Sequence, residues 1–147
     1  MERLINWKKQ GQSLVEVVVA VSITALIIVA LLIGAVIGIR NVQFSRNQSQ
    51  AMELNREVAE WLRTEKKIGW SQLFSNGSPS GESYCFNFLN FNNQGNCTES
   101  ELIDEKFVRE GVLRQEDEDK LEITVITSWR DPAGQHSETI STYLTKY

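Results

Sequence analysis

The sequence predicts an α+β fold in which one long N-terminal α-helix, part membrane-spanning and part amphipathic, packs on a small antiparallel β-sheet head. An uncharged apolar run from Val17 to Ile39 is the first sign, and a stretch without Pro or Gly from Arg40 to Ile68 is the second. The third is a set of short alternating segments in the C-terminal half. The mean hydropathy of −0.26 averages these unlike parts and describes neither.

The apolar run has the length of a membrane-spanning helix. Its 23 residues would extend over roughly 34 Å as a helix, against a bilayer core of about 30 Å. A lone strand in lipid would leave its backbone groups unsatisfied, so a helix is expected. A cleaved secretory signal is the alternative, but its apolar region is shorter, about 7–15 residues. We therefore expect an uncleaved single-pass anchor.

The flanking charges predict the orientation of this anchor. Arg3, Lys8 and Lys9 precede the apolar run, whereas only Arg40 and Arg46 follow it closely. Positive charge concentrates on the cytoplasmic side of membrane proteins. We expect the N-terminus in the cytoplasm and the C-terminal head outside.

Glu16 stands at the start of the apolar run. A carboxylate inside a membrane costs roughly 2.5–3.5 kcal/mol on insertion scales. Either Glu16 marks the membrane edge among headgroups, or it has a function within the apolar segment.

The residues around Glu16 favour a function. From Lys8 the chain reads KKQGQSLVEV, a basic leader ending in Gly11, then a hydroxyl residue, two aliphatic residues and Glu16. This segment resembles the processing site of type IV pilins and of the related pseudopilins of type II secretion. The resemblance implies that a prepilin peptidase cuts after Gly11. Glu16 then becomes the fifth residue of the mature chain, as in the family.

The resemblance also implies a route of assembly. The new amino terminus at Gln12, usually N-methylated in the family, would pair with Glu16 of a neighbouring subunit and set the register between helices. The family usually has Phe where this chain has Gln12, which leaves methylation of Gln12 open. Gly34 and Gly38 form a small-xxx-small pair that suits close helix packing, although glycine is also common in membrane helices.

These observations divide the chain into four parts. We expect a leader at 1–11, a membrane and filament-core helix at 12–39, an amphipathic helix at 40–69 and a sheet head at 70–147. One continuous helix from about Ser13 to Lys67 is favoured over two helices with a break at 40–49, where Asn and Ser weaken helix propensity.

The head pattern predicts three or four antiparallel strands joined by polar turns. Within the first strand, Phe86, Phe88 and Phe91 are the candidates for inward positions, and Gly111 weakens the second. The acidic run from Glu116 to Asp119 is expected to form a hairpin loop. The expected strands are Ser83–Phe91, Lys106–Leu113, Leu121–Trp129 and His136–Tyr147.

Cys85 and Cys97 are the only cysteines. A disulfide is expected because the head faces an oxidising compartment. Closing a loop of this size stabilises a fold by roughly 3 kcal/mol. Two free thiols or a metal pair are the alternatives, and no further ligand lies near in the sequence.

No catalytic constellation is evident, and we expect neither enzymatic activity nor a cofactor. His136 is the only histidine and reads as a surface residue. The acidic run offers oxygen ligands for Ca²⁺ but lacks EF-hand spacing, so a solvated loop is favoured and no metal site is predicted. After Ile39 the chain carries 12 Lys and Arg against 17 Asp and Glu, which argues against nucleic-acid binding by charge.

The resemblance therefore implies a structural subunit of a type IV pilus or a pilus-like filament. Its partners would be a prepilin peptidase, other pilin subunits, the membrane and an assembly platform. After assembly it would lie in an extracellular or periplasmic filament. A pseudopilin of a secretion or DNA-uptake system is one alternative, and a single-pass anchored binding protein is another. The sequence leaves open whether the subunit is major or minor and what its head binds.

Overall fold

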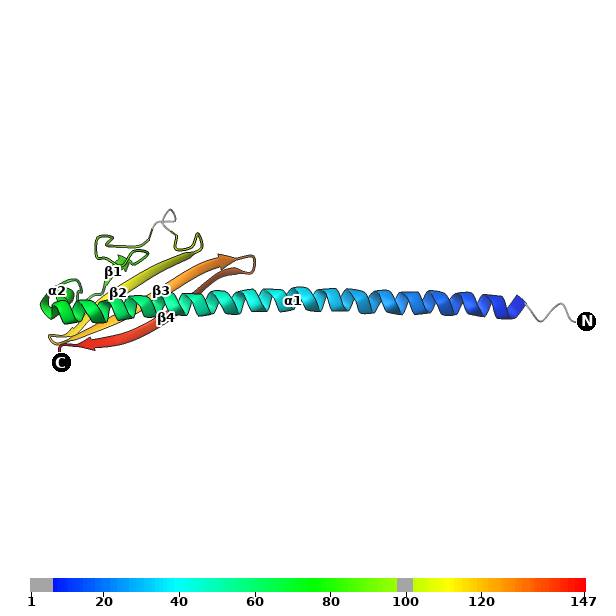
Figure 1. Ribbon diagram of the computed structural model, residues 1–147, viewed down its shortest axis with the longest axis horizontal. Coiled ribbons are helices and arrows are strands. Elements are labelled where there is room, and N and C mark those ends of the chain that lie inside the picture. Colours follow the sequence, from blue (N-terminus) through cyan, green and yellow to red (C-terminus); the bar gives the residue numbers. More distant parts are fainter. Residues whose placement is uncertain (1–6, 98–101) are drawn as a thin grey trace, which may run out of the picture. The chain divides into compact units, whose positions relative to one another are not determined.

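The computed structural model describes residues 7–97 and 102–147, with side chains from residue 14 onward (Figure 1). The chain divides into two compact units, Met1–Phe44 and Ser45–Tyr147. Its elements in order are α1 (Trp7–Ile68), α2 (Trp70–Ser75), β1 (Glu82–Cys85), β2 (Phe107–Asp117), β3 (Lys120–Asp131) and β4 (Gly134–Thr145).

Helix α1 confirms the prediction of one long helix. It runs unbroken through 40–49, so the alternative of two helices is wrong. It begins at Trp7 instead of about Ser13. Ser22 and Thr24 donate their hydroxyls to carbonyls four residues earlier, at 2.8 Å each, so the helix satisfies its own polar groups.

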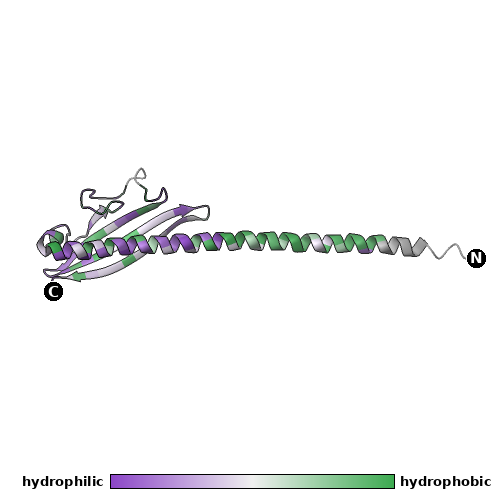
Figure 2. Cartoon of the chain, viewed as in Figure 1, coloured by the Kyte–Doolittle hydropathy of each residue, from purple (hydrophilic) through white to green (hydrophobic). Residues whose placement is uncertain are grey.

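The second part of α1 packs on the sheet through one apolar stripe. Ala51, Val58 and Leu62 are fully buried, at the spacing of a helix face. Charged residues such as Glu53 and Arg56 lie on the exposed side. Figure 2 shows how the residues of α1 change from mostly hydrophobic to a mixture of hydrophobic and hydrophilic along the helix. The amphipathic pattern of the sequence therefore predicts both this part of the helix and the side of it that is buried.

The sheet has the strand order β1-β2-β3-β4, and every neighbouring pair is antiparallel. Inward residues of β3, including Ile123 and Val125, are fully buried against α1. The predicted strand Leu121–Trp129 is confirmed within β3, and the predicted strand His136–Tyr147 is confirmed as far as Thr145, where β4 ends. The acidic run is only partly a loop, because β2 continues to Asp117 and the turn is formed by the next two residues.

The predicted strand Ser83–Phe91 is too long, since β1 ends at Cys85. The chain then folds back, and Asn93 accepts a backbone hydrogen bond from Cys85 at 2.8 Å. Phe86 is fully buried, but Phe88 is 59% exposed, so its inward assignment is wrong. The alternating pattern of apolar and polar residues does not mark the end of the strand at Cys85, because it continues into residues that form a loop.

Gly111 makes room for the core. A Cβ at this position would stand 2.6 Å from Cδ2 of Phe86 and still closer to its Cε2. Phe86 in turn lies edge-on to Trp61 of α1, with ring centroids 5.6 Å apart. The glycine that weakens the strand in isolation therefore allows an aromatic ring to lie flat on β2.

Candidate functional site

The apolar part of α1, residues 14–39, exposes large apolar side chains over its whole length. Large side chains such as Leu26 and Ile27 are 70% and 55% exposed, and no neighbour covers any residue from 14 to 39. Monomeric soluble proteins rarely expose so large an apolar surface. By length and composition this helix could cross a membrane.

Small and polar residues gather on one side of this helix. At about 100° per residue, Glu16, Ala20, Thr24, Gly34 and Gly38 all fall within about 40° of a single line, and Ile27 and Leu31 fall within the same strip. Apart from the backbone of α1 itself, nothing lies within 4 Å of where a Cβ would stand on either glycine. We call this strip the small-residue face. Around Gly34 and Gly38 it has room for another helix to approach closely, and Glu16 lies at its N-terminal end.

The predicted processing residues lie at the edge of the described chain. The backbone of Gly11 and Gln12 is helical within α1, whereas their side chains lie outside the described residues. Cleavage after Gly11 stays a prediction.

The predicted disulfide is confirmed. Cys85 and Cys97 are bonded, with their Cα atoms 4.8 Å apart. The backbone N–H of Cys97 donates to the carboxylate of Glu110 at 2.9 Å. Together these contacts fasten the loop after β1 to the sheet.

Arg109 is a structural centre that sequence reasoning missed. The residue as a whole is 2% exposed. Its Nε donates to the carbonyl of Phe86 at 2.8 Å, and its Nη1 donates to the carbonyl of Leu54 at 2.8 Å and to the Glu57 carboxylate at 2.6 Å. One guanidinium thus joins α1, β2 and the loop after β1. Its position two residues after the buried Phe107 was the available signal.

A second polar contact fixes α1 against β3 and β4. Asn55 is 1% exposed, donates to the carbonyl of Glu138 at 2.9 Å and accepts from the hydroxyl of Thr127 at 2.7 Å. Gln48 donates to the carboxylate of Glu138 at 2.7 Å. Directional bonds of this kind select one rotation of the helix on the sheet.

His136 lies in β4, opposite Trp129 and close to the turn between β3 and β4. It is half-buried, and its Nε2 lies 3.0 Å from Oδ1 of Asp131. The hydrogen bond from His136, helped by the backbone N–H groups of Ala133 and Gly134, lowers the pKa of the Asp131 carboxyl. His136 also lies against the ring of Trp129, with centroids 5.5 Å apart. These contacts stabilise the turn.

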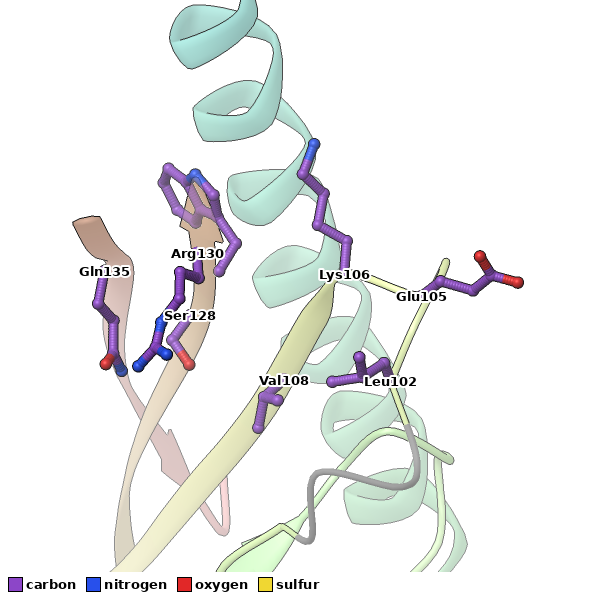
Figure 3. Close-up of a pocket in the computed structure, with 8 residues that line it drawn as sticks. Leu102, Glu105, Lys106, Val108, Ser128, Arg130 and Gln135 are labelled. Carbon is purple, nitrogen blue, oxygen red and sulfur yellow. The ribbon is translucent and has the colours of Figure 1, made fainter. Parts of the chain in front are cut away.

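An open pocket of about 360 Å³ lies beside this turn. Its volume is within the range of small-ligand sites, about 300–1,000 Å³. Figure 3 shows Lys106 and Glu105 pointing away from Arg130 and Gln135, so the polar groups do not converge. Lys106 instead donates to Asn47 at 2.7 Å. The pocket is lined by Leu102, Glu105, Lys106, Val108, Ser128, Trp129, Arg130 and Gln135.

Within the described side chains, no group of three or more His, Cys, Asp or Glu residues is placed to hold a metal ion. Asp119 of the acidic run pairs with Lys146 at 3.5 Å. No protein-family model, curated protein or solved structure matches the chain. Fold and site therefore define the protein as an α+β protein whose N-terminal helix is long and apolar enough to cross a membrane.

Proposed function

We propose that this protein is a pilin-like structural subunit. A prepilin peptidase cuts it after Gly11, and the mature chain assembles through α1 into a type IV pilus or a pilus-like filament. The observation that carries the proposal is the uncovered apolar part of α1 with Glu16 on its small-residue face. An apolar surface of this extent needs lipid before assembly and other helices after it.

Glu16 supports the proposal through its need for a cation. An unpaired charge in an apolar helix bundle is heavily penalised, and pairing with a neighbouring amine removes most of that cost. The terminal amine created at Gln12 supplies a cation about 6 Å from Glu16 along the helix axis, so a modest axial shift between two copies brings the amine of one level with Glu16 of the other. A pair between copies would give the filament one preferred axial step.

Removal of the leader also changes the charge of the chain. Residues 1–11 contain Arg3, Lys8, Lys9 and Glu2, a sum of +2, so the formal charge goes from −4 to −6 before the new amine is counted. The mature chain is more acidic, which further disfavours nucleic acid as a partner.

A pseudopilin of a type II secretion or DNA-uptake system would use the same helix and the same cut. An anchored extracytoplasmic binding protein is the candidate from another class, and the pocket beside Arg130 is the observation that favours it. Only the pilin-like candidates require cleavage after Gly11.

Co-expression of the full chain with a prepilin peptidase tests the proposal. Intact mass spectrometry should show the loss of residues 1–11, and Gly11→Ala should block the cut. Gln10→Ala is the matched control and should be cut normally. A chain that stays uncut with an active peptidase contradicts the proposal and leaves the anchored binding protein.

A further inference from the structure

The two walls of the pocket beside the β3–β4 turn direct their polar groups apart, but three polar side chains of one wall lie together. Arg130 of β3 stands opposite Gln135 of β4, and Ser128 lies two residues before Arg130 in β3. Opposite residues of an antiparallel pair, and residues two apart in one strand, point to the same side of a sheet. Figure 3 shows the ends of these three side chains next to one another.

The hydrogen-bonding capacity of this wall is not used within the chain. In the part of the chain whose side chains the structure describes, no hydrogen bond or ion pair involves the side chains of Ser128, Arg130 or Gln135. The acid next to Arg130 in the sequence, Asp131, bonds instead to His136 at 3.0 Å and to two backbone N–H groups of the turn. Among these residues Arg130 therefore keeps its positive charge available beside two further donors.

The other wall of the pocket is apolar where it faces these donors. Val108 of β2 faces the same side of the sheet and is half-buried, and Leu102 is 41% exposed. Glu105 and Lys106 also line the pocket, but both point away from Arg130 (Figure 3). A ligand beside Arg130 would meet a cation at one end and apolar side chains at the other.

We propose that this pocket binds a carboxylate attached to a small apolar group. A guanidinium donates two parallel bonds to a carboxylate, and the Gln135 amide and the Ser128 hydroxyl supply donors for its remaining lone pairs. One available cation balances a single negative charge, which suits a carboxylate better than a phosphate group of charge near −2. The apolar group would lie against Val108 and Leu102. The inference goes beyond filament assembly, because it concerns side chains of the head alone.

A titration of the full chain in detergent micelles, followed by NMR, tests the proposal. N-acetyl-leucine carries both the carboxylate and an apolar group, N-acetyl-leucine amide lacks the charge, and acetate lacks the apolar group. We expect N-acetyl-leucine to shift the amide signals of Ser128, Arg130 and Gln135 with a Kd on the order of 1 mM. The two control compounds should bind at least about tenfold more weakly. No shifts at these amides, equal binding of the neutral amide, or tighter binding of inorganic phosphate would overturn the proposal.

Three variants separate the contributions of the two walls. Arg130→Gln should weaken binding of N-acetyl-leucine at least about tenfold, because it removes the cation. Arg46→Gln is the matched control, since Arg46 is an exposed arginine of α1 outside the pocket, and it should bind as the natural chain does. Leu102→Ala should weaken binding of N-acetyl-leucine and leave that of acetate unchanged. Unchanged binding in Arg130→Gln would overturn the proposal.

Folding and binding are distinguished in the same variants. The three replaced residues are all exposed, so the variants should unfold at the same temperature as the natural chain. The titration does not depend on cleavage after Gly11, so its result is separate from that of the proposed function.

A further titration identifies the source of the carboxylate. A short acetylated peptide that ends in leucine offers the same carboxylate and side chain together with additional backbone groups. Binding at least about tenfold tighter than that of N-acetyl-leucine would identify the ligand as the carboxyl end of a peptide. Equal binding would identify it as a free small acid. Both results support the proposed site, whereas a peptide that fails to bind in company with N-acetyl-leucine would overturn it.

Discussion

The guanidinium of Arg109 lies 2.6 Å from the carboxylate of Glu57, but the two partners are unequally buried, with side chains 3% and 53% exposed. Arg109 also binds the carbonyls of Phe86 and Leu54. The arginine therefore satisfies buried acceptors, whereas the glutamate keeps access to water.

The first prediction follows from this difference in burial between Arg109 and Glu57. Arg109→Ala should lower the free energy of unfolding by about 3–5 kcal/mol, because it leaves buried carbonyls without a donor. Glu57→Gln should cost no more than about 1 kcal/mol, because the Glu57 side chain is itself half-exposed and glutamine keeps an oxygen that can accept from Arg109. Denaturant unfolding of the full chain in detergent, followed by tryptophan fluorescence, measures both. Equal losses in the two variants would contradict the assignment of Arg109 as the central contact.

The pattern of the sequence predicted the parts of the fold that depend on local periodicity. Helix α1 and strand β3 carry long, regular apolar repeats, and both were placed well. The end of β1 was misplaced because the loop after Cys85 keeps an alternating composition while its backbone turns back.

The contacts of Arg109 could not be read from the sequence. The contacts with Leu54 and Glu57 join residues more than 50 positions apart, and no local rule connects them. The disulfide could be predicted because the sequence has only two cysteines, and they lie close together along the chain. The role of Glu16 stays a prediction.

Gly111 gives a second prediction. Gly111→Ala should lower the free energy of unfolding by about 1–3 kcal/mol, because the added methyl group overlaps the ring of Phe86. Gly69→Ala is the matched control, since its Cβ would meet nothing closer than 3.8 Å. Thermal unfolding of the two variants distinguishes overpacking from a general effect of replacing glycine. A Gly111 variant as stable as the control would refute the role assigned to this glycine.

A third prediction concerns the disulfide. Replacing Cys85 and Cys97 together by serine should cost about 3 kcal/mol, because the unfolded chain gains the freedom of an open loop. Amide exchange at Gly95, which donates to Ser83, should accelerate in the variant. Dithiothreitol should reproduce both effects in the natural chain and change nothing in the double variant. Unaltered exchange at Gly95 would show that the loop holds the β1 edge without the disulfide.

The fourth prediction is a pH dependence. The folded pKa of Asp131 lies below its ordinary value of 3.8, mainly because His136 donates to it. Such a carboxylate contributes stability that is full above its unfolded pKa and is lost as the pH falls through the folded value. The melting temperature should therefore decline as the pH falls below about 4. Asp131→Asn should flatten this decline, and an identical acid profile in that variant would contradict the assignment.

The account rests most directly on Glu16, and its replacement provides the decisive measurement. Glu16→Gln should be cut after Gly11 as efficiently as we propose for the natural chain, yet should not enter filaments, because a neutral amide cannot form an ion pair with the amine of a neighbouring copy. Ser22→Ala is the matched control, since Ser22 lies on the opposite side of the helix and its hydroxyl bonds only to the carbonyl of Val18. The measurement is the fraction of cut chain that sediments as filaments from sheared cells. We predict at least a tenfold loss for Glu16→Gln and none for Ser22→Ala, and filaments of normal yield from the cut Glu16 variant would contradict the account.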